Sequence, residues 1–195
     1  WYPAEGMKLN HPCVGMLHDA NWWGKTKEML TLEEVVKSLP DVHFYWAGDG
    51  QYKTKILEVL EKFENFHYLG FLDYPDEVRK YLTEIDIYAL PTGMDTTPLS
   101  CRESMSMKKP IIGTNVGGIP EMIYHQKTGL LVDEGDSQAW IKSIELLLSD
   151  KELSKKLGDG ARNLVIEKFN WDILAKRFVE IIESSLGENI KHLNK

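Results

Sequence analysis

Residues 85–114 read IDIYALPTGMDTTPLSCRESMSMKKPIIGT, and this stretch decides the fold. It holds two short apolar runs, Ile85–Leu90 and Pro110–Thr114, bounded by glycine, proline or aspartate as buried strands are. Between them, Ser100–Met107 is predicted to be a helix. A strand, a helix and a second strand in this order indicate a parallel sheet with helices packed on it.

The same alternation of apolar runs and helical patterns continues along the whole chain. Further strands are predicted at Pro12–Leu17, Val42–Ala47, Phe66–Leu69 and Gly129–Val132. Apolar residues three and four positions apart, beginning at Met29, predict a helix that ends before Pro40. Other helices are predicted at Tyr52–Glu61, Asp76–Glu84, Ser137–Leu148, Leu153–Glu167 and Asp172–Ser185. The expected fold class is therefore α/β, a Rossmann-like parallel sheet of about six strands with helices on both faces.

Length and composition exclude several classes of protein. The chain has 195 residues, 43% of them hydrophobic, which is enough for one sizeable core. A net charge of −7 argues against a nucleic-acid partner. Cys13 and Cys101 lie outside any CxxC spacing, so neither a disulfide framework nor a zinc site is predicted. No stretch approaches the roughly 20 apolar residues that cross a bilayer. We expect a reducing, cytoplasmic location, with peripheral membrane association of the full-length protein as an alternative.

The first ten residues differ from the rest. They start at Trp1, carry Pro3 and Gly6, and lack the charged start and apolar run of a signal peptide. We interpret residues 1–10 as an interdomain linker cut from a longer chain, and residues 11–195 as the folded domain.

Ligands of open parallel sheets bind outside the carboxyl ends of the strands, so the informative residues are expected in the loops there. Four such loops are rich in glycine and short polar residues: Gly15–Gly24, Gly48–Gly50, Pro91–Ser100 and Asn115–Pro120. The Gly48 loop is interpreted either as a tight turn or as part of a nucleotide pocket, and it lacks the third glycine of an NAD-binding fingerprint. Gly117 and Gly118 either let the backbone approach a ligand closely or only relieve steric strain.

Two carboxylates follow the fourth predicted strand. Asp95 lies in the loop, and Glu103 lies in the first turn of the next helix, whose free N–H groups and macrodipole suit a diphosphate. A carboxylate beside that helix end can accept both hydroxyls of a ribose. The alternatives are that Ser100 and Glu103 form a capping box and that Asp95 is an ordinary turn residue.

The loop after the first strand carries charged residues whose roles stay open. Lys25 and Lys27 would reach a diphosphate as point charges or lie in solvent on a first helical turn. His18 has no partner at metal-ligand spacing, so we interpret it as a polar loop residue, and no metal site is predicted.

Together these segments resemble the C-terminal domain of glycosyltransferases built from two facing Rossmann domains (the GT-B fold), specifically the retaining group called glycosyltransferase family 4. The resemblance runs from about Val14 to the end of the chain. It is strongest over Asp95–Glu121, where an acidic residue is followed by Glu103 in RESMSMKKPIIGT and then by NVGGIPEMI. Residues 127–132 (KTGLLV) and 169–171 (FNW) add support.

The resemblance implies a function. The domain would bind a UDP-, GDP- or ADP-sugar for retaining transfer of the sugar to an acceptor hydroxyl, with no cofactor or metal required. Asp95 would lie near the donor sugar and Glu103 would bind the ribose. The other residues expected at the donor are Gly15, Lys25, Lys27, Gly48, Thr96, Thr97, Pro98, Leu99, Ser100, Gly117, Gly118 and Glu121. An N-terminal Rossmann domain of the same protein, absent from this sequence, would bind a saccharide or lipid acceptor, so this chain alone would turn over little or nothing.

Two departures from the family pattern matter. The family usually has an arginine just after the first glycine and a lysine just before another glycine, where this sequence has Met16 and Trp23. Asp95 is also shorter by one methylene than the usual glutamate. Either Lys25 or Lys27 replaces the missing cations, or the chain is a catalytically degenerate binding or scaffold domain. A nucleotide-sugar epimerase of the same architecture is a further alternative, and an NAD-dependent oxidoreductase is disfavoured.

Overall fold

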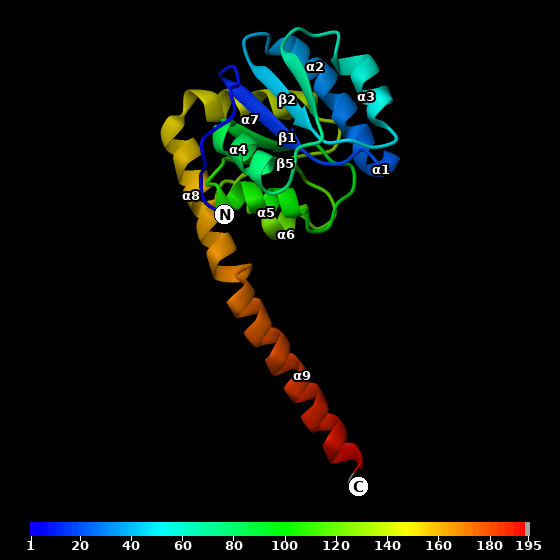
Figure 1. Ribbon diagram of the computed structural model, residues 1–195, viewed down its shortest axis with the longest axis vertical. Coiled ribbons are helices and arrows are strands. Elements are labelled where there is room, and N and C mark those ends of the chain that lie inside the picture. Colours follow the sequence, from blue (N-terminus) through cyan, green and yellow to red (C-terminus); the bar gives the residue numbers. More distant parts are fainter. Residues whose placement is uncertain (194–195) are drawn as a thin grey trace.

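The computed structural model describes residues 1–193, with side chains described as far as Leu186, so the last two residues of the predicted domain lie outside it. Six parallel strands form one sheet in the order β3-β2-β1-β4-β5-β6, and helices cover both of its faces (Figure 1). This confirms the predicted fold class. The strands are β1 (Cys13–Leu17), β2 (His43–Ala47), β3 (Phe66–Gly70), β4 (Ile87–Leu90), β5 (Ile111–Thr114) and β6 (Leu130–Val132).

The helices differ from the predicted set at two places. They are α1 (Trp23–Thr26), the 3-10 helix η1 (Lys27–Thr31), α2 (Leu32–Ser38), α3 (Lys53–Leu60), α4 (Asp76–Glu84), α5 (Leu99–Ser106), α6 (Ile119–Met122), α7 (Ser137–Ser149), α8 (Lys151–Lys168) and α9 (Trp171–Leu193). The single helix expected from Met29 to before Pro40 is divided into η1 and α2, and α1 precedes it as a further short helix that the sequence did not predict. The loop after β5 contains the short helix α6, which begins after Gly118 with a proline in its first turn and which the sequence did not predict.

The strand order reverses at β1. From β1 the sheet extends through β2 to β3 on one side and through β4, β5 and β6 on the other. The chain after β1 leads to β2 in one half of the sheet, and the chain after β4 leads to β5 in the other half. The loops after β1 and β4 therefore diverge at the carboxyl edge of the sheet. This is the topological switch point at which open α/β sheets bind their ligands.

Apolar layers on the two faces hold the sheet rigid. Helices α2, α3 and α7 pack on one face around Trp46 and Trp140, and α4, α5, α6 and α8 pack on the other around Tyr81 and Met105. Tyr81 is fully buried, and its hydroxyl donates to the carbonyl oxygens of Tyr45 at 2.7 Å and Met16 at 3.1 Å. The polar group is thus satisfied inside an otherwise apolar core.

The last helix leaves the body of the domain. Helix α9 follows α8 and projects away from the sheet (Figure 1). It carries large apolar side chains that are exposed, among them Trp171, Phe178 and Ile181. Within the described residues, no helix is long and apolar enough to span a membrane.

Candidate functional site

A cavity of about 330 Å³ opens at the carboxyl edge of the sheet, at the switch point. Its walls come from the loops after β1, β2 and β3 and from the start of α5. The lining residues are Leu17, His18, Asp19, Lys25, Ala47, Gly48, Phe71, Leu72, Tyr74, Val78, Pro98, Leu99, Ser100 and Glu103. The structure thus gathers six residues of the sequence prediction in one place: Lys25, Gly48, Pro98, Leu99, Ser100 and Glu103.

Glu103 is a buried carboxylate without a local structural role. Helix α5 begins at Leu99 and its N-cap is Pro98, so the alternative in which Ser100 and Glu103 form a capping box is wrong. Glu103 lies one turn deeper, in the second turn, with 4% of its surface exposed, and its Oε1 has no hydrogen-bond partner among the described residues. Burial raises the pKa of Glu103, and the nearby hydroxyl of Tyr74 and the Arg102 guanidinium offset only part of this effect.

The amino end of α5 points donors at the same cavity. No side chain caps this helix, so the amide groups of its first turn are free of intrahelical partners and of a side-chain acceptor. Ser100 lies in that turn, and its Oγ accepts a hydrogen bond of 2.8 Å from the buried Tyr88 hydroxyl. The same hydroxyl lies 3.2 Å from the Leu17 carbonyl oxygen, which ties α5 to the end of β1. Such a helix end suits an anion.

Lys25 brings a positive charge to the cavity. Its Nζ lies 3.1 Å from Asp95 Oδ2 and 3.6 Å from Asp19 Oδ2, and its side chain is 19% exposed. Burial acts to raise the pKa of Asp19, but the Asn21 amide and Lys25 outweigh it and hold that pKa below its ordinary value. Among the described residues, the positively charged Lys or Arg side chain that lines this cavity is therefore Lys25. Its ammonium group already contacts two carboxylates, those of Asp95 and Asp19.

His18 is a neutral acceptor in the cavity wall. It is 7% exposed, and its Nδ1 lies 3.1 Å from the Asp19 carbonyl oxygen, so Nδ1 carries the proton and Nε2 is an acceptor without a partner in the described part of the chain. Burial lowers the pKa of His18 to about 4. The sequence interpretation placed it among the polar loop residues and missed its position in the wall.

Two glycines let loops meet where a side chain would not fit. A Cβ on Gly48 would lie 2.0 Å from the His18 carbonyl oxygen, and one on Gly118 would lie 2.2 Å from the Thr96 carbonyl oxygen. The Gly118 amide also donates to the Asp95 carbonyl oxygen at 3.0 Å. The contacts of Gly118 with Thr96 and Asp95 fix the loop after β5 against the loop after β4, and thereby position Asp95.

Several predicted site residues lie outside the cavity. Gly15 is inside β1, where a Cβ would meet the side chains of Ile85 and Tyr81, so the loop expected to begin at Gly15 begins at His18. Lys27 turns away and pairs with Glu134 at 2.9 Å. The remaining ones lie in or beside the neighbouring loops without lining the cavity: Asp95, Thr96, Thr97, Gly117, Gly118 and Glu121.

The loop after β3 supplies wall residues that the sequence interpretation missed. Phe71 and Tyr74 line the cavity, yet they are 71% and 60% exposed, respectively. Their position after a strand was a usable signal, because every loop at the carboxyl edge is a candidate for ligand contacts. The loop contains no glycine-rich or acidic motif, so the sequence pattern did not indicate a role in the site.

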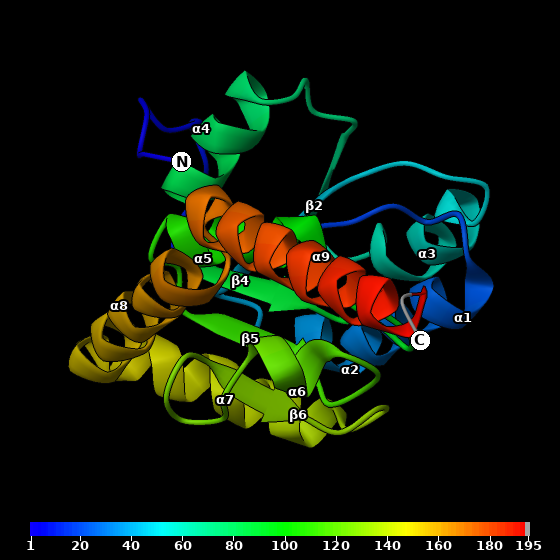
Figure 2. The same ribbon diagram turned by 90° about the horizontal axis from the view of Figure 1, so that it is seen from below.

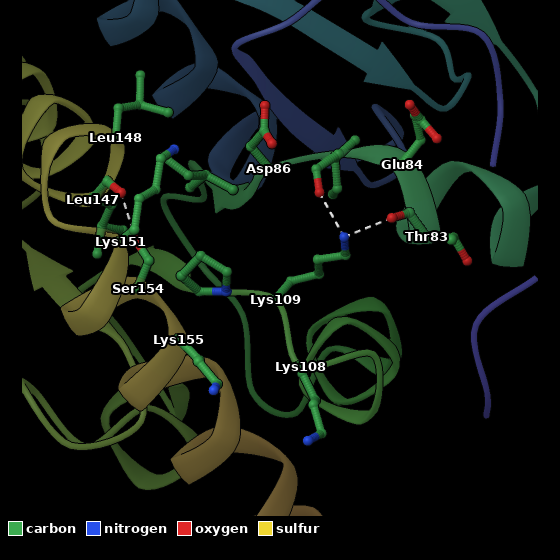
Figure 3. Close-up of a pocket in the computed structure, with 13 residues that line it drawn as sticks. Thr83, Glu84, Asp86, Lys108, Lys109, Leu147, Leu148, Lys151, Ser154 and Lys155 are labelled. Carbon is green, nitrogen blue, oxygen red and sulfur yellow. Dashed lines mark hydrogen bonds between the residues drawn. The ribbon is translucent and has the colours of Figure 1, made fainter.

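A second cavity, of about 400 Å³, lies at the opposite edge of the sheet, next to the amino ends of β4 and β5 (Figure 3). Lys109 points across it, and its Nζ donates to the carbonyl oxygens of Thr83 at 2.6 Å and Ile85 at 2.7 Å, where α4 ends. Lys108 pairs with Asp159 at 2.7 Å. Most charges of this cavity thus have structural partners, which favours the cavity at the switch point as the functional site.

The fold and this cavity define an α/β domain with a pocket at the carboxyl edge of a parallel sheet, and comparison with known proteins specifies the family. Residues 12–150 match the family described as glycosyl transferases group 1, and the chain belongs to it. It is 32% identical over 149 residues to N-acetyl-alpha-D-glucosaminyl L-malate synthase of Bacillus anthracis, a match that covers 76% of this chain and 39% of that protein.

Solved structures share the fold. A C-terminal domain of a group 1 glycosyl transferase from Francisella tularensis has a TM-score of 0.71 at 20% identity, covering 87% of this chain and 96% of that domain. The Anabaena protein HepE, solved in complex with UDP-glucose, has a TM-score of 0.79 at 19% identity, covering 90% of this chain and 49% of that one. The chain spans less than half the length of the curated relatives it matches.

Proposed function

We propose that the cavity at the switch point binds the nucleotide part of a nucleoside diphosphate sugar. The observation that carries this proposal is Glu103 Oε1, a buried carboxylate oxygen without a partner among the described residues, at a cavity wall. Such an atom costs free energy unless a ligand donor satisfies it. The two neighbouring hydroxyls of a ribose are suitable donors. Membership of the glycosyl transferase group 1 family and the fold shared with a UDP-glucose complex support the same ligand class.

The rest of the nucleotide fits the other walls. Phe71 and Tyr74 offer exposed aromatic faces for a base on one side of Glu103. On the other side, the uncapped amino end of α5 and Ser100 face the place where a diphosphate would extend. This order puts base, ribose and diphosphate along one line across the cavity.

Neutralisation of the diphosphate rests on Lys25 and the helix end. Met16, at the place where the family usually has an arginine, is fully buried in the core and faces no ligand. Lys25 must serve a diphosphate while it also contacts Asp95 and Asp19. We therefore expect weaker donor binding than a site with two free cations would give.

The transfer itself follows from this placement. Asp95, at the end of the phosphate path, would lie near the donor sugar. The acceptor oxygen forms a bond to the anomeric carbon on the face from which the nucleoside diphosphate leaves with the bonding electron pair, and the hydroxyl proton passes to a phosphate oxygen of that leaving group. The electrostatic task of this domain is to stabilise the charge that develops on that leaving group, and α5 and Lys25 are placed to do so. We propose retention of the anomeric configuration and no required metal.

The acceptor would be bound by a preceding domain of the same protein, docked on α9. Trp171, Phe178 and Ile181 leave apolar surface on α9 exposed, and large exposed apolar surfaces mark interaction sites. The chain covers less than half of its curated relatives, so a domain-sized partner is expected. Trp1 lines one small cavity with Asn170, next to the start of α9, so a domain joined there would meet this helix.

A degenerate binding domain is the second candidate, and one observation favours it. Lys25 is held by two carboxylates, and among the residues that the structure describes no second Lys or Arg lines the cavity. Such a domain would bind nucleotide weakly and transfer no sugar.

A transfer assay separates the candidates. The protein with its preceding domain is incubated with UDP-glucose, GDP-mannose or ADP-glucose, with saccharide and lipid acceptors and without added metal. We expect one donor to release its nucleoside diphosphate with a product of unchanged anomeric configuration by NMR, and Glu103→Ala to reduce the rate. Donor binding without transfer to any acceptor would favour the degenerate domain, and an epimerised sugar would favour an epimerase.

A further inference from the structure

Residues 1–11 form a strap along α4, and its carboxyl end is clamped by ion pairs. The two ring nitrogens of His11 lie 2.8 Å from Asp86 Oδ2 and 2.9 Å from Glu84 Oε1. Two carboxylates accept from both nitrogens, which requires the protonated imidazole, and the neighbouring carboxylates raise the pKa of His11. His11, Cys13 and Asp86 also place potential metal-ligand atoms within 4.8 Å of one another. Because both ring nitrogens already have partners, we interpret this cluster as a clamp.

Backbone contacts hold the middle of the strap. The Met7 amide lies 3.4 Å from the Lys80 carbonyl oxygen, and the Ala4 amide donates to Thr83 Oγ1 at 3.1 Å. A Cβ on Gly6 would overlap the Glu84 carboxylate, so the strap passes directly over the end of α4. The segment interpreted from sequence as a linker is therefore packed on the domain along its length.

The amino end of the strap reaches the donor cavity. Trp1 contacts the ring of Tyr74, with ring centroids 5.8 Å apart and an interplanar angle of 59°, a favourable tilted arrangement. Its carbonyl oxygen lies 3.4 Å from Arg162 Nη1 of α8. The amino end is seen beside α4 and the start of α9 in Figure 2.

Tyr74 connects this contact to Glu103. It lies in the loop between β3 and α4 and lines the same cavity as Glu103, and its hydroxyl acts to lower the pKa of the Glu103 carboxyl. With 60% of its surface exposed, Tyr74 has little packing of its own to fix its ring. Trp1 is the aromatic side chain that contacts it within the described residues.

We propose that Trp1 is a positioning residue for the donor cavity, holding the Tyr74 ring in the wall so that its hydroxyl faces Glu103. The inference rests on the proposed nucleotide site. It makes the strap part of that site, although Trp1 itself contacts no ligand. It also adds a specificity element for the base, because the orientation of Tyr74 shapes the end of the cavity opposite α5.

The arrangement has a pH signature. The Tyr74 hydroxyl favours the ionised form of Glu103, which is the form that accepts ribose hydroxyls. The other charged or titratable groups around Glu103 are Arg102, Tyr88, Lys25, His18 and Asp19. Of the groups around Glu103, Tyr74 is the one with which Trp1 makes a ring contact, so we expect removal of Trp1 to change the acid limb of nucleotide binding through Tyr74. Loss of the hydroxyl contact raises the pKa of Glu103, and binding then fails at a higher pH than in the unmodified protein.

The test is a calorimetric titration between pH 4.5 and 8 with whichever of UDP, GDP or ADP binds most tightly. The variants are Trp1→Ala, Trp1→Phe, Tyr74→Phe, Tyr74→Ala, and Tyr74→Ala combined with Trp1→Ala. Tyr2→Ala is the matched control, since Tyr2 is on the same strap, is 73% exposed and faces Arg162. Thermal unfolding verifies that each variant is folded.

We expect Trp1→Ala to weaken binding by about three- to tenfold, the scale of fixing one side chain on binding. The acid limb should move to higher pH in both Trp1→Ala and Tyr74→Phe, and Trp1→Phe should restore most of the affinity. Trp1→Ala should add nothing in the Tyr74→Ala background.

Unchanged binding in Trp1→Ala, or an equal loss with and without Tyr74, would overturn the positioning role. Nucleotide binding that Glu103→Ala leaves intact would overturn the proposed site together with it.

Discussion

His18 makes the stability of the domain depend on pH in a defined window. It is buried, and burial lowers its pKa from an ordinary value of 6.5 to about 4. The unfolded chain therefore takes up a proton near pH 6.5, whereas the folded chain does so only near pH 4. The stability contributed by neutral His18 is present above pH 6.5 and is lost as the pH falls toward 4.

The difference between the two pKa values corresponds to about 3 kcal/mol of unfolding free energy between pH 7 and pH 4. The assay is urea unfolding of the unmodified chain and of His18→Gln at pH 7, 5.5 and 4. Other titrating groups act in both proteins, so the difference between the two curves isolates His18. We expect the stability advantage of the unmodified chain over the variant to fall by about 3 kcal/mol across this range. Parallel curves would refute the assignment of a neutral buried His18.

Three further predictions concern the cavity and its loops. Lys25→Met should weaken the calorimetric binding of a nucleoside diphosphate by about 1 to 2 kcal/mol and leave binding of the bare nucleoside unchanged. Lys27→Met is the control and should change neither titration, because Lys27 pairs with Glu134 outside the cavity. Gly118→Ala should lower the free energy of unfolding in urea by about 1 to 3 kcal/mol, because the added Cβ would meet backbone atoms. Gly24→Ala should lower it far less, because the added Cβ would lie 3.4 Å from the flexible end of a methionine side chain. Equal effects of the two substitutions would contradict the packing of the loops. Nucleotide binding should weaken as the pH falls through the raised pKa of Glu103, and Glu103→Gln should remove that acid limb in calorimetry; an unchanged limb would assign it to another group.

The sheet was predictable because apolar runs between glycine, proline and aspartate have few alternatives to buried strands. Residues 85–114 did form a strand, a helix and a strand, with β4 and β5 as neighbours. The carboxyl-edge rule then pointed to the correct end of the sheet. A helix start is less well defined by sequence, and placing the start of α5 at Ser100 rather than Leu99 made a capping role an alternative for Glu103.

The orientation of individual side chains was beyond the sequence. Lys25 and Lys27 are two residues apart on consecutive helical turns, so they point in different directions, and only Lys25 lines the cavity. Tyr74 carries no local motif, and its neighbour Trp1 is distant in sequence. Contacts of this kind depend on packing between elements, which local patterns do not encode.

Calorimetric titration of this chain with UDP, GDP and ADP, at low salt and without metal, beside Glu103→Ala, tests the central claim most directly. We expect saturable binding of one of these nucleotides to the unmodified chain. We expect Glu103→Ala to lose about 1 to 3 kcal/mol of that binding free energy, the scale of removing a charged hydrogen-bond partner. Binding that the substitution leaves unchanged, or no binding of any of the three nucleotides, would contradict the placement of the donor at this cavity.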